Sequence, residues 1–309
     1  MRHYFAPMEG LTDSIYRRLH HKYFPGADRY YMPFLSPTIH RTLTHKEDRE
    51  LPMAERVPFT AVPQILTKVS QDFLWAARVC ADRGYSEVNL NIGCPSGTVV
   101  SKGKGAGMLR DTAELDAFLD EVFASSPLPI SVKTRLGLER AEEFPAILQV
   151  LNRYPIRELT IHPRVRKQFY DGAVSMEMFD YAVSESTNPL CYNGDIRSLS
   201  QVRELQQRYP KLEAVMIGRG LIADPGMLSG GTQADALEGF LTELLSVYET
   251  EFGGSRNAMF RMKENWGFLH SRFEGSDKLW KSLRKTTDVS EFKSLSAQIL
   301  HTCPFRSDP

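Results

Sequence analysis

The sequence lacks paired metal-binding cysteines, and this absence narrows the class of protein. Its four cysteines form no C-x-x-C pair, so a zinc or iron–sulfur centre has no support; they are Cys80, Cys94, Cys191 and Cys303. Four thiols in 309 residues are too few for a disulfide scaffold. We therefore expect reduced cysteines, a cytoplasmic location and no metal site.

Long apolar runs and a net charge are also absent. No stretch approaches the roughly 20 apolar residues of a membrane span, and the first residues show no secretion signal, so we expect no membrane partner. The formal net charge is zero, from 38 basic and 38 acidic residues. Any nucleic-acid contact must then come from local patches, and the absence of a polyanionic partner is an equal alternative on charge alone. We expect a monomer.

The chain does contain short apolar runs that alternate with amphipathic segments. Helical spacing links Phe73, Ala76, Ala77 and Cys80, and again Leu115, Phe118, Leu119 and Val122. The predicted strands are mostly β-branched or aromatic: Tyr4–Ala6, Arg29–Met32, Ala61–Leu66, Glu87–Asn91, Ile130–Thr134, Glu158–His162, Leu190–Asn193 and Ala214–Ile217. Eight strands separated by helices predict an α/β protein with a TIM (β/α)8 barrel. An open doubly wound sheet is the alternative, but no G-x-G-x-x-G follows the first strand.

The C-terminal part has a different pattern. The glycine-rich stretch Gly226–Thr232 is expected to leave the barrel, and Ala236–Glu249 and residues 257–301 have helical character. We predict a barrel over residues 1–235 and a small helical domain over 236–309. Residues 254–309 hold ten lysines and arginines against six acidic residues, which favours contact with a polyanion such as RNA.

Candidate catalytic residues follow the predicted strands, because a barrel builds its site at the carboxyl ends of its strands. Cys94 lies just past the fourth strand, between Gly93 and Pro95. An unperturbed thiol stays protonated at neutral pH and can donate a proton. A turn cysteine without a role is the alternative.

The next two strands end in basic residues. Lys133 would point into the barrel mouth, where burial of its charge requires an anionic ligand or a barrel carboxylate. His162 and Arg164 are two residues apart and share one side if the chain is extended, so they can donate hydrogen bonds to a negatively charged or carbonyl-rich ligand. A satisfied core histidine is the alternative.

The last two strands end in glycine-containing loops, Asn193-Gly-Asp195 and Ile217-Gly-Arg-Gly220, where barrels commonly bind phosphate. Asp224-Pro225 is expected to open a short helix aimed at the anion. The basic loop of residues 101–107, with Lys102 and Lys104, could close over a polyanion or be a solvated flexible loop.

In this order, the motifs resemble those of the tRNA-dihydrouridine synthases. The matching stretches cover the whole predicted barrel: Ala6-Pro-Met-Glu-Gly-Leu-Thr-Asp13, Pro63-Gln-Ile-Leu66, Asn89-Leu-Asn-Ile-Gly-Cys-Pro-Ser96, Gly105-Ala-Gly-Met-Leu109, Ser131-Val-Lys-Thr-Arg135, Ile161-His-Pro-Arg164, Asn193-Gly-Asp195 and Ile217-Gly-Arg-Gly220. Arg261-Met-Lys263 resembles a helix-borne basic motif of the family more loosely.

The resemblance implies an FMN-dependent oxidoreductase that reduces uridines in tRNA, with NADPH as reductant. It assigns the flavin to a set of residues: Pro7 and Met8 against the ring, Gln64 at its pyrimidine edge, Lys133 at N1/O2, His162 beside it, and Asn193, Asp195, Gly218 and Arg219 at the phosphate. Cys94 would be the general acid and Asn91 would place the uracil. The tRNA would meet Lys102, Lys104, Arg164, Arg261 and Lys263.

The implied mechanism delivers hydride from flavin N5 to C6 of an extruded uridine and a proton from Cys94 to C5. Tyr30 and Phe34 are candidates for stacking on the base. The chain departs from the family where His162-Pro-Arg-Val165 replaces a more usual His-Gly-Arg-Thr, and where Gly97 replaces a lysine after Cys-Pro-Ser. These departures concern the substrate more than the flavin.

Two other functions remain open on the sequence. One is an FMN-dependent barrel that acts on a free small molecule, which would not need the basic C-terminal domain. The other is a non-catalytic RNA-binding relative, against which the set of Cys94, Lys133 and His162 argues.

Overall fold

Nine parallel strands form one sheet in the computed structural model, which describes residues 1–306. They lie in the order β3-β2-β1-β9-β8-β7-β6-β5-β4. Their bounds are β1 Arg2–Phe5, β2 Arg29–Tyr31, β3 Ala61–Val62, β4 Gln64–Ile65, β5 Val88–Ile92, β6 Ile130–Arg135, β7 Leu159–His162, β8 Leu190–Tyr192 and β9 Ala214–Ile217.

The sheet closes on itself through a single interrupted strand. Pro63 separates β3 from β4, since proline has no N–H to offer a ladder. β3 pairs with β2 and β4 pairs with β5, so the two ends of the sheet belong to one continuous stretch of chain. Counting that stretch once, the eight predicted strands are all present, and the TIM barrel is confirmed while the open sheet is wrong.

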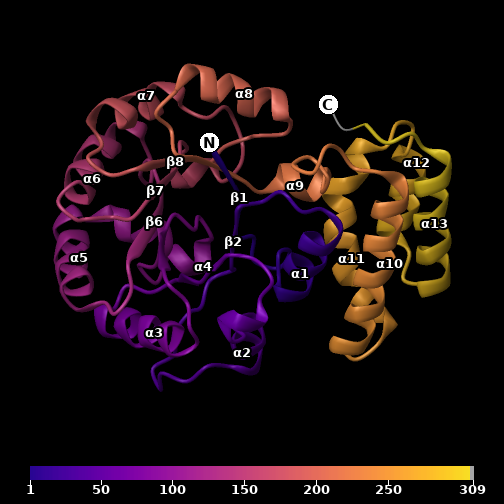
Figure 1. The fold of residues 1–309 in the computed structure, drawn as a ribbon, viewed down its shortest axis with the longest axis horizontal. Helices are drawn as coiled ribbons and strands as arrows, with labels where there is room; N and C mark the ends of the chain where they lie inside the picture. The colour runs from indigo at the N-terminus through magenta and orange to yellow at the C-terminus, as the bar shows by residue number, and fades with distance from the viewer. Residues whose placement is uncertain (307–309) are drawn as a thin grey trace. The chain divides into compact units, whose positions relative to one another are not determined.

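Helices cover the outside of the strands. Around the sheet, α3, α5, α6 and α7 follow one another along the chain (Figure 1). The two apolar sets predicted from helical spacing are buried in α3 and α5. The helices of this part are α2 His45–Glu50, α3 Ser70–Asp82, α4 Gly97–Val100, α5 Thr112–Ser125, α6 Phe144–Leu151 and α7 Met176–Glu185.

The inside of the barrel is filled at the amino ends of the strands. Tyr4, Tyr31 and Cys191 belong to a buried interior cluster. Below it the Tyr4 hydroxyl donates to Glu158 at 2.9 Å, and Arg29 pairs with Glu87 at 2.9 Å. Burial raises the pKa of the Glu158 carboxyl. This end is thus sealed by packed rings and paired charges.

The chain divides into two compact units, and each unit is made of three segments that are separate in the sequence. The first is residues 1–7, 29–194 and 209–216, which hold the strands; the second is residues 8–28, 195–208 and the chain from 217 onward. The expected boundary at residues 235 and 236 stays a prediction.

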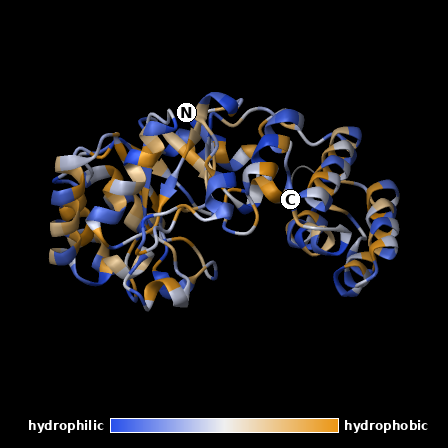
Figure 2. Cartoon of the chain, turned by 90° about the horizontal axis from the view of Figure 1, so that it is seen from below, coloured by the Kyte–Doolittle hydropathy of each residue, from blue (hydrophilic) through white to orange (hydrophobic). Residues whose placement is uncertain are grey.

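The second unit is helical. Its elements are α1 Ser14–Tyr23, α8 Leu199–Arg208, α9 Arg219–Ala223, α10 Ala234–Glu251, α11 Ser255–Leu269, α12 Asp277–Lys285 and α13 Val289–Thr302. α1 packs on α10 through Tyr16 and Phe24, whose rings meet Phe240 at centroid distances of 5.3 and 5.6 Å. Hydrophobic and hydrophilic stripes run along these helices (Figure 2). In residues 1–306 no helix is both long and apolar enough to cross a bilayer.

Candidate functional site

The inner face of the barrel carries a polar layer near the carboxyl ends of the strands. Asn91 pairs in register with Lys133, and Lys133 pairs with Thr160. Because directly paired residues of parallel strands share one face, these side chains line the same wall. Cys191 pairs with Thr160 and lies in the interior cluster, which identifies this wall as the inside.

The turn that carries Cys94 is held by its own strand. The side-chain oxygen of Asn91 accepts hydrogen bonds from the N–H groups of Gly93, at 3.0 Å, and Cys94, at 2.9 Å. Arg135 donates from Nε to the carbonyl of Gly93 at 3.0 Å. Cys94 is half-buried. Asn91 therefore orients the predicted acid, a task that its assignment to the uracil did not include.

A second segment clasps the same turn. The N–H of Ala106 donates to the carbonyl of Cys94 at 3.1 Å. Gly105 adopts a φ of +57°, and a β-carbon there would lie 2.9 Å from both Cβ and the carbonyl oxygen of Cys94. The glycines of this segment are thus needed for close packing. Residues 105–109 are buried, so that part of the loop is not solvated, whereas Lys102 is exposed.

Gln64 belongs to a buried amide chain across three strands. Its Nε2 donates to Asn89 at 2.8 Å, its Oε1 accepts from Asn91 at 2.7 Å, and Asn89 donates to Ser131 at 3.0 Å. Buried amides must be paired in this way, because an unpaired one costs roughly 1–3 kcal/mol. Among residues 1–306, the second N–H of the Gln64 amide has no acceptor, so it can donate to a ligand.

Lys133 is the unusual group on this wall. Its ammonium makes no hydrogen bond or ion pair with any of residues 1–306. Burial, and next the neighbouring charge of Arg135, lower the pKa of Lys133 to about 7. A salt bridge to a barrel carboxylate, the alternative from sequence, is absent within the described residues. An anionic ligand would satisfy this cation.

His162 and Arg164 are brought together as their spacing predicted. An arginine Nη1 lies 3.1 Å from His162 Nε2. Since guanidinium groups only donate, Nε2 accepts, and the proton of the neutral imidazole is on Nδ1. Arg164 is 1% exposed and also donates to the carbonyl of Gly172. The buried position of Arg164 therefore does not support its predicted contact with tRNA. In the structure Arg164 orients the imidazole of His162.

The predicted phosphate residues fall in both units. In the first, Asn193 donates to the carbonyl of Met216 at 2.7 Å. In the second, Gly218 precedes α9, and Arg219 pairs with Asp195 at 2.6 Å. Asp195 has a φ of +46°, which aspartate tolerates better than most residues.

The expected helix at Asp224-Pro225 is wrong. A five-residue helix, α9, comes before it, and Asp224 stands at its carboxyl end. The Asp224 carboxylate accepts from the hydroxyl of Thr232, and Gly226 N–H donates to that hydroxyl at 2.7 Å. The aspartate ties the glycine-rich turn together instead of starting a helix. The N-terminal N–H groups of α9 begin at Arg219, directly after the predicted Gly218.

Four further assigned residues lie where their motifs place them. Pro7 and Met8 follow β1 and are half-exposed, and Met8 N–H donates to the Thr12 hydroxyl at 2.9 Å. Lys104 is half-exposed and donates to the Ser36 hydroxyl at 3.3 Å. Lys102 makes no ion pair with a described residue.

Arg261 and Lys263 lie on α11, as expected, but both are used inside the helical unit. Arg261 pairs with Asp13 at 3.1 Å, and the hydroxyl of Tyr248 donates to the same carboxylate at 3.1 Å. Lys263 donates to the carbonyls of Arg284 and Thr286. Burial lowers the pKa of Lys263. Contact with tRNA by these two residues stays a prediction.

Two corrections concern residues outside the assigned set. Tyr30 is fully buried, with its ring centroid 4.3 Å from that of Phe59, so it cannot stack on a ligand; Phe34 is half-buried.

The sequence analysis also missed Arg135, which donates to the Cys94 turn and has its guanidinium carbon 5.5 Å from the ring centroid of Tyr170. Strand alternation could have identified it, since it lies two residues beyond Lys133 on the same face.

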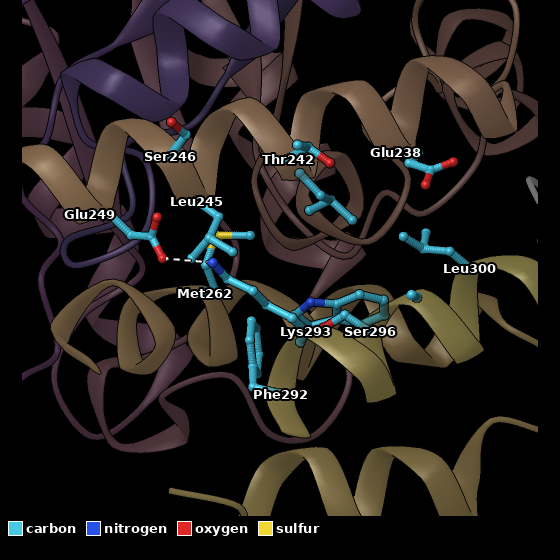
Figure 3. A pocket seen from close by; sticks show the side chains of 13 residues that line it. Glu238, Thr242, Leu245, Ser246, Glu249, Met262, Phe292, Lys293, Ser296 and Leu300 are labelled. Atoms are coloured by element: carbon cyan, nitrogen blue, oxygen red, sulfur yellow. Dashed lines mark ion pairs between the residues drawn. The ribbon is translucent and has the colours of Figure 1, made fainter. Parts of the chain in front are cut away.

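A cavity of about 320 Å³ lies elsewhere, between α10, α11 and α13 (Figure 3). Its walls include Leu241, Met262 and Trp266, and the ion pair of Lys293 with Glu249, at 3.0 Å, lies across it. No assigned residue lines it. The chemistry-bearing groups are on the barrel wall instead.

The closed parallel sheet and its interior polar wall define a TIM-barrel protein, and solved structures share this fold. Morphinone reductase superposes with a TM-score of 0.55 at 11% identity, over 75% of this chain and 86% of its own. An old yellow enzyme homologue of Zymomonas mobilis gives 0.51 at 12% identity, over 72% and 86%. At these identities the likeness concerns the fold alone.

Sequence relatives define the family. The model described as "Dihydrouridine synthase (Dus)" matches residues 4–290, and the chain belongs to this family. A protein named probable tRNA-dihydrouridine synthase 1, from Synechocystis, is 27% identical and covers 96% of this chain and 86% of its own. The tRNA-dihydrouridine synthase B of Pasteurella multocida is also 27% identical, over 72% and 67%.

Proposed function

We propose that this protein is an FMN-dependent tRNA-dihydrouridine synthase, which reduces particular uridines of tRNA with electrons from NADPH. The observation that carries the proposal is the ammonium of Lys133 on the inner wall, which has no partner within residues 1–306 and lies one strand from the turn of Cys94. Family membership supplies the reaction class.

The donor set suits a flavin. A half-buried cation that lacks a partner among residues 1–306 is matched by a ring that gains negative charge when reduced. Lys133 would lie at N1/O2, with His162 beside the ring and the remaining N–H of Gln64 at the pyrimidine edge. Pro7 and Met8 would pack on the ring. Asn193, Asp195, Gly218 and Arg219 are the proposed phosphate residues.

The proposed reaction adds a hydride and a proton across the C5–C6 bond of uracil. The chemistry that FMN would supply when bound and reduced is the hydride to C6. Cys94 donates the proton to C5, and its sulfur is left as a thiolate. The charges of Cys94 and Lys133 interact, so the cation stabilises that thiolate. Asn91 and Arg135 fix the backbone of the turn while the proton moves.

The target base must leave the folded tRNA to reach this wall, since its C5–C6 edge is covered while it is stacked. The local excess of basic residues after residue 254 favours contact with the body of the tRNA. Arg164 is buried and Arg261 is paired with Asp13, so we propose that exposed cations make that contact instead.

The test is dihydrouridine formation on an unmodified tRNA with NADPH. We expect the purified protein to carry the visible absorbance of oxidised flavin and to form product. Cys94→Ala should keep that absorbance and its bleaching by NADPH, yet lose at least 100-fold in product formation, because only the proton donor is removed. Turnover of a small enone with no product on any tRNA would instead identify a small-molecule reductase.

A further inference from the structure

A cation from another loop lies on the turn of the proposed acid. Arg166, which follows β7, donates from Nε to the carbonyl of Pro95 at 3.2 Å. Its backbone N–H donates to Gly137 at 2.8 Å, and its guanidinium carbon lies 5.4 Å from the ring centre of Phe169. The arginine is thus fixed at its base and along one face. It joins the residue next to Cys94 to the wall formed by β7.

The outer edge of this guanidinium is not used by the protein. Its two Nη groups make no hydrogen bond and no ion pair with any of residues 1–306. A β-carbon built on Gly97 would lie 3.8 Å from Nη2. Glycine at this position therefore leaves one side of the guanidinium uncovered, beside the start of α4.

Other cations lie on the loops that follow β4 and α4. Lys68 lies with Nζ 3.3 Å from where a β-carbon of Gly103 would be, and it is exposed. Lys102 is exposed. Within residues 1–306, Lys104 donates a hydrogen bond only to the hydroxyl of Ser36. We call Lys68, Lys102, Lys104 and Arg166 the rim cations. None pairs with a carboxylate within residues 1–306.

We propose that the rim cations bind backbone phosphates of the nucleotides that flank the target uridine, and that Arg166 transmits this binding to the turn of Cys94. The inference rests on the proposed function and adds the residues that hold the extruded strand. A guanidinium anchored through Nε keeps its two Nη groups in one plane, the geometry that takes two oxygens of a phosphate. Lysines add point charges along the strand.

Phosphate binding also acts on the acid. Occupied Nη groups hold the arginine in one rotamer, which keeps its Nε bond to the carbonyl of Pro95. The turn is then fixed by Asn91, Arg135, Ala106 and Arg166 from four segments of chain. Arg166 is a positioning residue in this account, because it touches RNA and the turn without touching the reacting atoms.

The experiment uses the flavin-loaded protein and an unmodified tRNA transcript. It compares wild type with Arg166→Ala, Arg166→Lys and, as a matched control, Lys211→Ala. Lys211 is an exposed cation just before β9, at the opposite end of the strands from Cys94. Binding is measured from 50 to 300 mM salt, and product formation is measured in single turnover at saturating tRNA.

We expect Arg166→Ala to weaken binding about tenfold at low salt and to reduce the slope of log affinity against log salt by about one phosphate contact. Single turnover should fall a further tenfold or more. Arg166→Lys should restore the slope but not the turnover, since an ammonium cannot hold the carbonyl and a phosphate together. Lys211→Ala should match wild type.

An unchanged salt slope in Arg166→Ala would overturn the phosphate site, even if the variant were less stable. A lysine variant with full turnover would overturn the coupling to Cys94. A failure of the proposed function can be distinguished from a failure of the phosphate site. If wild type bound tRNA but formed no dihydrouridine on any transcript, the slope comparison would still decide whether Arg166 meets a phosphate.

Discussion

At the scale of single residues, the site depends on Lys133, whose charge no carboxylate among residues 1–306 neutralises. Lys133 lies in a β-strand with buried neighbours on both sides, and its pKa is about 7. Keeping it charged without flavin costs free energy, because desolvation disfavours the ammonium. The charged Lys133 therefore destabilises the flavin-free protein, and a bound anionic flavin would offset this loss of stability.

This cost predicts a pH-dependent effect of Lys133→Met on the flavin-free protein. The pKa is about 7 in the native state and near 10.4 in the unfolded chain. Between these values the unfolded chain binds more protons, so wild-type stability rises as the pH increases from 7 to 10. We expect the variant to be more stable than wild type at pH 7, on the order of 2 kcal/mol, since partial contact with water reduces the full penalty.

Thermal unfolding at pH 7 and pH 10 measures this difference. The gain should shrink toward pH 10, where native Lys133 is neutral in wild type. The exposed substitution Lys211→Met is the control and should give no pH-dependent gain. A Lys133→Met variant that is less stable than wild type at both pH values would contradict the interpretation. The same variant should bind flavin more weakly.

Individual wall residues were predictable from sequence because a β-strand alternates strictly. The motif Ser131–Arg135 fixes which side chains share a face, and register then places Lys133 beside Asn91. The bonds of Arg135 and Arg166 to the Cys94 turn could not be predicted. They join positions more than forty residues apart, and no local pattern records which carbonyl a long side chain reaches.

At the scale of elements, Cys94, the proposed general acid, is held by two short segments that carry no strong propensity of their own. The turn after β5 and the 3-10 helix Gly105–Arg110 pack backbone against backbone. Such contact is possible only where a β-carbon is missing. The sequence drew attention to the glycine-rich loop as a possible polyanion contact, which stays a prediction; the burial of residues 105–109 reflects tertiary packing that composition does not reveal.

Gly105→Ala tests this packing. The new β-carbon would meet Cβ and the carbonyl of Cys94 at 2.9 Å, so the turn must move, and the φ of +57° adds strain. We expect a loss of 2–4 kcal/mol in stability, from about 1–3 kcal/mol of backbone strain plus the steric clash, and at least tenfold in product formation at saturating tRNA.

Gly84→Ala is the matched control for Gly105→Ala. Its φ is +84°, but the nearest atom is the Ala54 β-carbon at 3.6 Å. It should lose stability from the backbone alone and keep its turnover per folded molecule. Equal turnover in both variants, measured with intact flavin, would show that the position of Cys94 tolerates displacement and would argue against the clasp.

At the scale of the whole molecule, charge is distributed unevenly while the sum is zero. Exposed lysines on α12 recur at helical spacing, at Lys278, Lys281 and Lys285, and none pairs with a carboxylate in residues 1–306. The C-terminal excess of basic charge was visible in the sequence. Which cations are exposed was not, because burial and pairing decide that.

Changing Lys278, Lys281 and Lys285 together to glutamine should weaken tRNA binding, because three exposed charges are lost without loss of packing. The slope of log affinity against log salt should fall by up to about two. Reduction of the bound flavin by NADPH should be unaffected. Binding titrations over a salt series measure the slope, and a slope equal to that of wild type would remove α12 from the RNA-binding surface.

We expect Arg261→Ala to lower the stability of the helical unit. It leaves the Asp13 carboxylate, which is 7% exposed and caps α1, with only the Tyr248 hydroxyl and the α1 backbone. Because the Arg261 side chain is 25% exposed, its loss should cost less than the removal of a fully buried partner, on the order of 1–3 kcal/mol, and we expect a lower melting temperature. Arg256→Ala, an exposed change on the same helix, should be neutral. A fully stable Arg261→Ala with weakened tRNA binding would favour the original RNA assignment.

The packed rings and paired charges fill the barrel at the amino ends of the strands, so the polar wall faces the opposite end. Tyr4, Tyr31 and Glu158 pack and hydrogen-bond at that end, so we expect any molecule that meets the wall to arrive and leave at the carboxyl ends of the strands. Nicotinamide and uracil would have to alternate there, each departing before the other enters. Steady-state rates measured against both substrates should accordingly give parallel double-reciprocal lines, and an excess of NADPH should compete with tRNA.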